Sequence, residues 1–147
     1  MTTLVFRALD RHVVGGLADN NAVEDDRGPL SYAQLLHESA CVAGAMSHLG
    51  VVSGTEVAIG ISRGRNLVIA VLACARLGAV PGDLAAYRFA GEVFHTPETE
   101  IPWDLLMRAG RSEPAPAPDH DPEGYEDLMT AGFPDIFAPL LAGESII

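Results

Sequence analysis

Lysine is absent from the chain, and all nine of its basic residues are arginine. A lysine ammonium group serves enzymes as a Schiff-base nucleophile or as a compact point charge, and the guanidinium group of arginine does not replace it in these roles. We therefore exclude from this chain any mechanism in which a lysine of its own reacts with a substrate or neutralises a leaving group.

Cysteine is scarce as well. The two cysteines, Cys41 and Cys74, fall in apolar stretches with helical periodicity, and their spacing matches no zinc or redox motif. We interpret both as small buried hydrophobic residues, which is the usual environment of a free cysteine. This usage agrees with a reducing cytoplasm, where we expect the protein to be located.

Long hydrophobic runs and targeting signals are also missing. The longest apolar run, residues 67–75, has the length of a buried helix and is too short to cross a bilayer. Residues 1–6 carry no basic segment of the kind that opens a secretory signal. Because 48% of the residues are hydrophobic, we expect a globular protein. We expect no membrane partner, since no run spans a bilayer and an acidic chain is repelled by anionic membranes.

The net charge of −11 is distributed unevenly. Residues 1–89 hold eight acidic residues and seven arginines, whereas residues 90–147 hold twelve acidic residues against Arg108 and Arg111. Such an acidic segment repels phosphate backbones, so we predict no nucleic-acid partner. Eight of the ten prolines also lie beyond residue 89. We therefore divide the chain into an α/β unit, residues 1–89, and an irregular, Pro-rich acidic extension, residues 90–147.

Hydrophobic periodicity and turn residues predict the elements of the first unit. A long helix begins at Ser31, which forms a capping box with Gln34, and ends at Gly50. Strand, helix and strand then follow in order, which predicts the α/β fold class with a partial, mostly parallel sheet and packed helices. The other expected elements are a helix at 4–13 that breaks at Gly15-Gly16, strands at 21–24, 28–30, 55–61 and 79–80, and helices at 66–77, 103–109 and 124–131.

One catalytic-looking motif is present. Residues 60–64 fit G-x-S-x-G between a predicted strand and helix, the setting in which a nucleophile elbow exposes a serine, here Ser62. A small serine hydrolase would use Asp83 or Asp119 and then His95 or His120, with residues 12–16 as an oxyanion loop. The alternative is that Ser62 is the N-cap of the following helix. We prefer the cap, because proline-rich segments do not hold a triad within hydrogen-bond distance.

Other polar groups indicate no built site. Arg63 and Arg65 could meet an anion at a helix start, but they are also typical of a solvated turn. His37 and His48 lie toward the polar side of the long helix. We assign no catalytic, cofactor-binding or metal-binding residue to this chain. The acidic group that comes closest to a metal site fits no EF-hand or zinc spacing and is interpreted as a solvated linker: Asp119, His120, Asp121 and Glu123.

Four segments, in order, resemble AMP-forming acyl-CoA synthetases of the acetyl- and propionyl-CoA type. They are "LVFRALDRHVVGGLADNNAVEDD", "LSYAQLLHESACVAGAMSHLGVVSGTEVAIGI", "AVLACARLGAV" and "IPWDLLMRAGRSEPAPAPDHDPE", and together they cover most of residues 4–123. The resemblance implies an enzyme that joins a short carboxylate to ATP, with magnesium, and passes the acyl group to coenzyme A. It also implies a Ser/Thr/Gly-rich phosphate loop and a catalytic lysine.

This chain departs from the family where the family's chemistry resides. After residue 123 it reads "GYEDLMTAGFPD" in place of the phosphate loop, and Thr130-Ala131-Gly132 is only a faint echo of that loop. A glycine pair that helps to hold coenzyme A in the family is replaced by "VPGDLAAYRF". We therefore expect a truncated synthetase relative that is inactive alone, binds no cofactor by itself and acts as a binding or interaction module.

Two alternatives stay open, a part of a split synthetase and the small serine hydrolase. Strands that belong to a larger sheet in the intact enzyme would leave exposed edges in this chain. We therefore expect self-association or a complementary synthetase chain that covers them.

Overall fold

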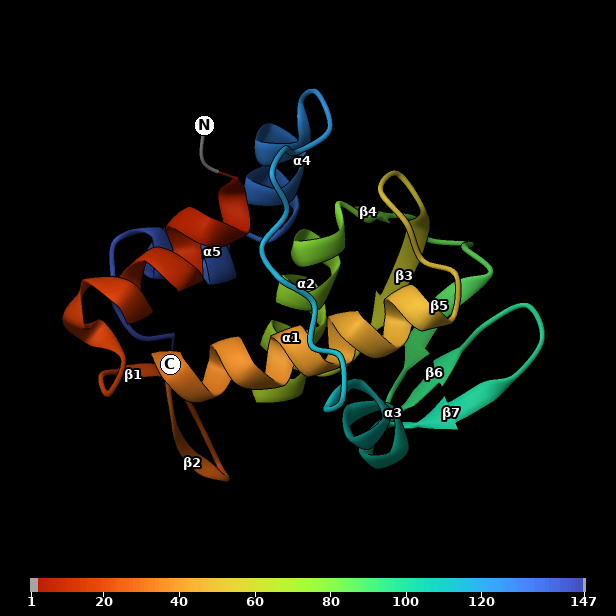
Figure 1. Ribbon diagram of the computed structural model, residues 1–147, viewed down its shortest axis with the longest axis horizontal. Coiled ribbons are helices and arrows are strands. Elements are labelled where there is room, and N and C mark those ends of the chain that lie inside the picture. The colour runs from red at the N-terminus through yellow and green to blue at the C-terminus, as the bar shows by residue number, and fades with distance from the viewer. Residues whose placement is uncertain (1–2, 147) are drawn as a thin grey trace.

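The computed structural model describes residues 3–146 of the chain. A β-hairpin lies at one end of the molecule and a larger sheet at the other, with the helices between them (Figure 1). The helices are η1 (Phe6–Asp10), η2 (Val13–Leu17), α1 (Tyr32–His48), α2 (Arg65–Leu77), α3 (Trp103–Gly110), α4 (Tyr125–Gly132) and α5 (Pro134–Leu141), and the strands are β1 (Asn21–Asp25), β2 (Gly28–Ser31), β3 (Glu56–Gly60), β4 (Val80–Pro81), β5 (Tyr87–Ala90), β6 (Val93–His95) and β7 (Glu100–Pro102).

The N-terminal helix and the hairpin follow the sequence prediction closely. Helical turns, largely of the π type, run to Leu17, and they are interrupted at Gly16, whose φ of 105° suits glycine and few other residues. Strands β1 and β2 pair antiparallel, as expected. A segment near the other end of the chain extends this hairpin. The backbone N–H of Ile146 donates to the Ala22 carbonyl at 2.8 Å, and the Glu24 N–H donates to the Ile146 carbonyl at 2.9 Å.

Helix α1 begins with the predicted capping box. The backbone N–H of Gln34 donates to Ser31 Oγ at 3.2 Å, and the Ser31 N–H donates to Gln34 Oε1 at 2.9 Å. The helix packs against α2 and, at its other side, against α3. Gly110 allows the α1–α3 contact, because a Cβ there would lie only 1.6 Å from the carbonyl oxygen of Cys41. The backbones of the two helices therefore touch directly.

The larger sheet has five strands in the order β4-β3-β5-β6-β7. Strand β3 is parallel to β4 and β5, whereas β5, β6 and β7 pair antiparallel. The α/β class with packed helices is confirmed, and the sheet is mixed rather than mostly parallel. The antiparallel half arises because Gly91, with φ of 60°, reverses the chain between β5 and β6. No strand was predicted over residues 87–102, since three- and four-residue strands leave little alternation to detect.

The acidic segment contains more regular structure than its composition suggested. The short helices predicted at 103–109 and 124–131 are present as α3 and α4. Helix α5 was not predicted, because Pro134 and Pro139 fall within it; Pro134 occupies the first helical turn, where a missing N–H costs little. Trp103, Tyr125 and Phe137 are buried in the core shared with the rest of the chain. The domain boundary at residue 89 stays a prediction, and β5 runs across it.

Proline-rich residues 111–124 form the irregular part of the segment and run along the helices. The backbone N–H of Ala115 donates to the Ala40 carbonyl of α1 at 2.9 Å, and Arg76 Nε of α2 donates to the Ala115 carbonyl at 2.9 Å. These bonds fix the extended stretch against both long helices. Across residues 3–146, none of the helices is both long and apolar enough to cross a membrane.

Candidate interaction surface

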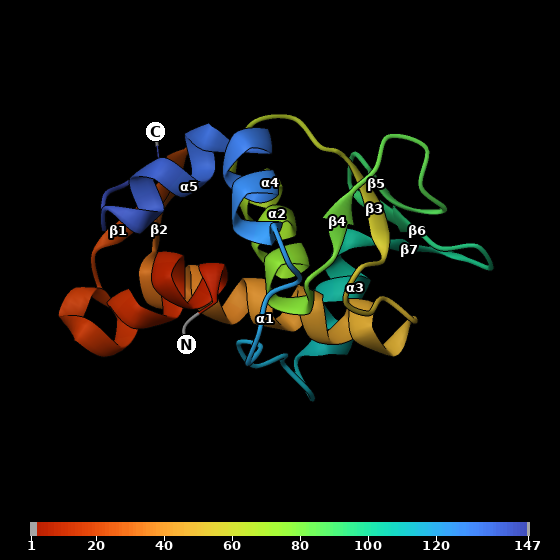
Figure 2. The same ribbon diagram turned by 90° about the horizontal axis from the view of Figure 1, so that it is seen from above.

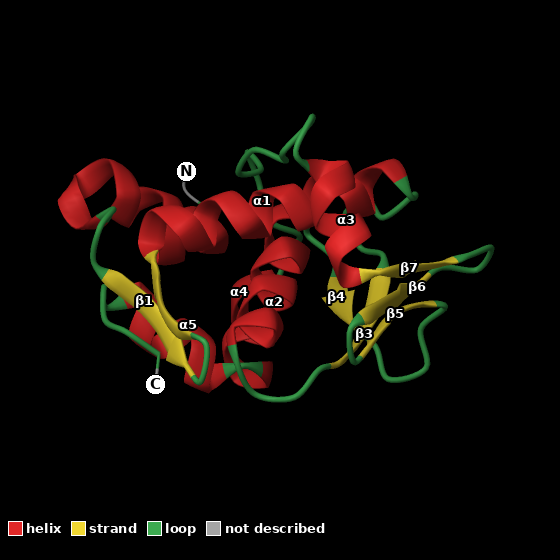
Figure 3. Cartoon of the chain, turned by 90° about the horizontal axis from the view of Figure 1, so that it is seen from below, coloured by secondary structure: helices red, strands yellow, loops and turns green. Residues whose placement is uncertain are grey.

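The five-stranded sheet is covered on one face. Val57, Phe89 and Phe94 are buried on that face, and the ring of Phe89 lies 5.9 Å from the ring of Trp103 in α3. Helix α3 and the end of α1 lie against this side, whereas only loops of the described residues lie on the other side (Figures 2 and 3). One face of the sheet therefore lacks the covering layer that an α/β fold usually supplies.

Strand register identifies the residues of the uncovered side, which we call the outer face. Ala58, Arg88, His95 and Glu100 are aligned across β3, β5, β6 and β7, and Gly60, Ala90, Val93 and Pro102 form the next row. Within the first row, His95 Nδ1 lies 3.2 Å from the Glu100 carboxylate. The outer face thus combines a charged row with a row of small and apolar residues, and its edge strands β4 and β7 are short. Short edges limit non-specific pairing but leave a few backbone groups for a partner.

The first turn of α2 is capped by a residue of the hairpin, which is distant in sequence. The backbone N–H of Arg65 donates to Asp25 Oδ2 at 2.9 Å, so that a carboxylate 40 positions away caps the helix. The N-cap residue itself is Gly64, and Ser62 is exposed in the preceding loop. The prediction that Ser62 caps this helix is therefore wrong, because the helix begins two residues later, after Gly64, and Asp25 occupies the place of the capping acceptor.

Arg65 and Asp25 also form an ion pair. Arg65 Nη2 lies 3.1 Å from Asp25 Oδ1 and donates to the Gly28 carbonyl at 2.8 Å, and both side chains are largely buried. Burial alone would raise the pKa of Asp25, but the hydrogen bonds from Arg65 and from the Arg27 N–H lower it below its usual value. Arg65 thus belongs to the fold, which corrects its interpretation as part of a solvated turn.

A second buried ion pair was not anticipated. Arg76 of α2 is 4% exposed and binds the Asp10 carboxylate with both terminal nitrogens, at 2.7 and 3.1 Å. Arg76 is the single charge within residues 67–77 of this helix, which are otherwise apolar. A buried charge in such a stretch requires a partner, and this is the signal that would have identified the pair. The pair joins η1 to α2.

The structure does not assemble the residues of a serine hydrolase. Ser62 is exposed, and its hydroxyl takes part in none of the hydrogen bonds among residues 3–146. His95 contacts Glu100 on the outer face, and His12 of the supposed oxyanion loop donates from its ring to the Leu140 carbonyl at 2.7 Å. The remaining candidates lie in exposed loops: Asp83 after β4, and Asp119 and His120 before α4. Hydrolysis by Ser62 stays a hypothesis.

The acidic residues before α4 lie around a small surface cavity. Asp119, His120 and Asp121 line a small cavity beside the N-terminal helix, and Glu123 is exposed at the tip of the loop. Within residues 3–146, no three His, Cys, Asp or Glu side chains are arranged to hold a metal ion. Asp121 Oδ2 instead accepts a hydrogen bond from the Leu4 N–H at 2.8 Å.

The cysteines and histidines predicted from the pattern are where they were expected. Cys41 and Cys74 are free and buried. Burial raises the pKa of Cys74 to about 12, and burial raises the pKa of Cys41 as well, so both favour the unreactive thiol. His37 and His48 are exposed on α1, and His48 Nε2 lies 2.9 Å from the Glu113 carboxylate.

Comparison with known proteins identifies the scaffold. The family model for AMP-binding enzymes matches residues 10–85. The acetyl-coenzyme A synthetase of Deinococcus radiodurans is 42% identical over 84 residues, which is 54% of this chain and 13% of that protein. The mitochondrial acyl-CoA synthetase short-chain family member 3 of Rattus norvegicus is 33% identical over 122 residues, 76% of this chain and 18% of that protein. This chain thus matches a small part of each relative.

Solved structures show the same fold. The N-terminal subdomain of NpsA from Klebsiella oxytoca, in complex with 3-hydroxybenzoyl-AMSN, superposes with a TM-score of 0.61 at 18% identity, covering 80% of this chain and 35% of that one. The family match includes the residues that form the hairpin, α1, β3 and α2, as expected if these elements are the common scaffold. By sequence and by fold, the chain belongs to the AMP-binding enzyme family.

Proposed function

We propose that this chain is the N-terminal scaffold of an acetyl- or propionyl-CoA synthetase-type enzyme, inactive by itself, which binds a complementary synthetase chain through its outer face. The observation that carries the proposal is the sheet that helices cover on one side only. A sheet face that is left without a packing layer is the surface on which an α/β fold adds further structure. The family match supplies the identity of the expected partner.

We propose that the residues of this chain do not by themselves supply the family's chemistry. Activation of a carboxylate by ATP requires donors that neutralise pyrophosphate, and the chain has no lysine to do so. The stretch "VPGDLAAYRF" after α2 lacks paired glycines for a close approach of coenzyme A. We therefore derive no catalytic step in this chain and propose that ATP, magnesium and coenzyme A are bound by the partner.

Reconstitution tests the proposal. The partner is the Deinococcus radiodurans acetyl-coenzyme A synthetase from which the segment that matches this chain has been deleted, and acetate-dependent exchange between pyrophosphate and ATP is measured. We expect no exchange with either chain alone and measurable exchange with both. Exchange by this chain alone, or no complex between the two by light scattering, would refute the proposal.

A pair of surface variants locates the interface. Ala90→Arg places a long charged side chain on the small row of the outer face, where Ala90 is exposed. Val14→Arg adds the same charge to η2, at a side chain that is 83% exposed. The η2 segment lies at the opposite end of the molecule from the five-stranded sheet (Figure 1). We expect Ala90→Arg to abolish the complex and Val14→Arg to leave it intact. If the chain alone forms a dimer that Ala90→Arg dissociates, the partner on this face is a second copy.

A further inference from the structure

The two parallel strands that flank β3 are joined by a very short connection. Strands β4 and β5 lie on either side of β3 and both run parallel to it, so the chain has to cross β3 on one face of the sheet. Residues 82–86 make this crossing and contain no helix. A connection between parallel strands usually has a dozen or more residues and consists of a helix that packs on the sheet. This connection is therefore too short to bring a covering layer with it.

The connection crosses β3 on the outer face. Val57 is buried on the covered face, and the Glu56 side chain points to the opposite side because successive residues of a strand alternate. A Cβ at Gly82 would lie 3.0 Å from the Glu56 Cβ, so the chain leaves β4 on the Glu56 side. Figures 2 and 3 show the same arrangement, with the loop that leads into β5 on one side of the sheet and α3 on the other. The outer face is thus the side on which a connecting helix would lie.

The middle of the outer face is lined by small residues. Ala58 and Gly60 on β3 and Ala90 on β5 have side chains of one carbon or none, so a helix can pack close to these strands. Leu84, within the connection, is 99% exposed and adds a large apolar side chain on the same side. Small residues beneath it and an apolar side chain beside it are contacts that suit the apolar stripe of an amphipathic helix.

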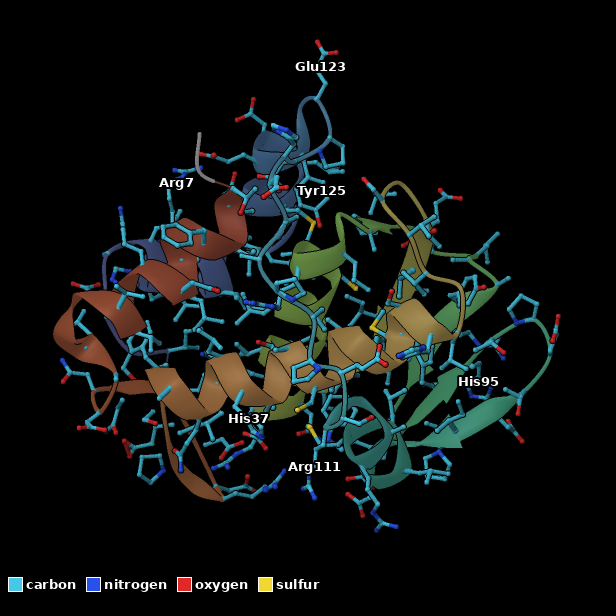
Figure 4. All side chains as sticks on the ribbon, viewed as in Figure 1. Arg7, His37, His95, Arg111, Glu123 and Tyr125 are labelled. Carbon is cyan, nitrogen blue, oxygen red and sulfur yellow. The ribbon has the colours of Figure 1, made fainter. Side chains whose placement is uncertain are left out.

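The charged row of the outer face contains one charge without a partner. His95, labelled in Figure 4, is paired through Nδ1 with the Glu100 carboxylate at 3.2 Å. Arg88 lies on β5, the middle strand of the sheet, and forms no ion pair within residues 3–146. A layer that covers the sheet would bury this guanidinium group, and a buried charge requires a charged partner. The covering element therefore has to supply a carboxylate near the middle of the sheet.

We propose that the outer face binds an amphipathic helix of a partner chain, which lies where a connecting helix would lie and places a carboxylate opposite Arg88. A helix of about 12 residues is about 18 Å long, which matches the length of about 17 Å of the five-residue strand β3. Addition of a strand at the sheet edges is disfavoured, because β4 and β7 contain Pro81 and Pro102, which have no backbone N–H to donate. That the helix belongs to a complementary synthetase chain rests on the proposed function, whereas the helical form of the occupant does not.

A tethered helix tests the inference without any partner chain. An amphipathic helix of about 12 residues, with one glutamate within its apolar stripe and Gly-Ser linkers at both ends, is inserted between Leu84 and Ala85. Short linkers give an effective concentration of about 1 mM, so a helix with a Kd of about 0.1 mM occupies the face about ten to one. The readout is the reaction of an Ala90→Cys variant with a thiol reagent, since Cys41 and Cys74 are buried. We expect the insertion to slow this reaction about tenfold.

Controls separate a packed helix from a general effect of the insertion. Val14→Cys, at the exposed position in η2, should react equally fast with and without the insertion. Arg88→Glu brings like charges together and should remove most of the protection of the cysteine at position 90. Lysine in place of the helix glutamate should then restore the protection. A helix that covered the sheet by apolar contact alone would not respond to this exchange of charges.

The outcomes distinguish this inference from the proposed function. Unchanged reactivity of Ala90→Cys after the insertion would overturn the inference, as would protection that is indifferent to the charge exchange. A dimer of the native chain that the insertion converts to a monomer would identify a second copy as the occupant and would also overturn it. Reconstituted pyrophosphate exchange without protection by the tethered helix would support the proposed function alone. Protection without reconstitution would support the helix site alone.

Discussion

The contact between α1 and α3 makes a sharp prediction about Gly110. In a Gly110→Ala variant the new methyl group would lie 1.6 Å from the carbonyl oxygen and 2.5 Å from the carbonyl carbon of Cys41. Helix α3 would have to move by at least about 1.4 Å to bring the closer contact to 3.0 Å. The obstacle is backbone, which has no alternative rotamer, so the helices themselves must separate.

The size of the effect is set by two opposing contributions. Alanine stabilises a helix over glycine by about 0.5–1 kcal/mol. Overpacking of a filled core costs about 1–3 kcal/mol, and a clash with backbone belongs at the upper end of that range. Movement of α3 would also disturb the packing of Trp103 and Leu106, two residues of this helix that are buried. We therefore expect Gly110→Ala to lower the free energy of unfolding by about 2–3 kcal/mol.

Urea unfolding measures this change. Trp103 is the single tryptophan of the chain and lies in α3, so its fluorescence reports on the perturbed helix. The matched control is Gly132→Ala, because Gly132 also ends an eight-residue helix and a Cβ there would meet nothing within 4 Å. We expect the control to be neutral or stabilised by about 0.5 kcal/mol. Equal midpoints for the two variants would refute the close backbone contact.

Three further predictions concern ionisable groups. Asp25→Asn keeps an oxygen that can accept from the Arg65 N–H but removes the charge of the ion pair with Arg65, so it should lower stability by about 1–3 kcal/mol. The pKa of Asp25 is lowered in the folded chain, so the ionised carboxylate stabilises the wild type at pH values above the usual carboxyl pKa. This stabilisation is lost as pH falls through the folded pKa. Thermal scans of the variant should not show that acid-dependent loss. Tyr32, whose burial raises its pKa to about 12, stabilises the chain below pH 10, and this contribution should disappear as pH rises from 10 to 12, unlike in Tyr32→Phe. Cys41 and Cys74 should react with a thiol reagent at pH 8 only after urea is added; rapid reaction of the folded chain would contradict their burial.

The elements that could be predicted from sequence are those with local signals. The capping box at Ser31 and Gln34 lies within four residues, and the hairpin turn lies between its own strands. Helix α5 and strand β7 escaped prediction because prolines interrupt one and the other has three residues. Tertiary packing stabilises both, and no local pattern records it.

The candidate sites were predictable to a smaller extent, because their chemistry depends on partners that are distant in sequence. Ser62 has the right motif and strand–loop–helix context, but its hydroxyl forms no hydrogen bond among residues 3–146. Asp25 and Arg65 are separated by 40 positions, and Leu4 and Asp121 by 117. Spacing in the sequence carries no information about such pairs, whereas a lone arginine in an apolar helix, such as Arg76, does predict that a partner exists.

The pairing of Ile146 with β1 has a consequence for the order of events during synthesis. Ile146 completes the hairpin that begins at Asn21, so the sheet at that end of the molecule stays unfinished until residue 146 has left the ribosome. Contacts of such long sequence separation form late and slow the final folding step. Nascent chains that stall before residue 140 should therefore expose the edge of β1 to chaperones, although α1 has already been made.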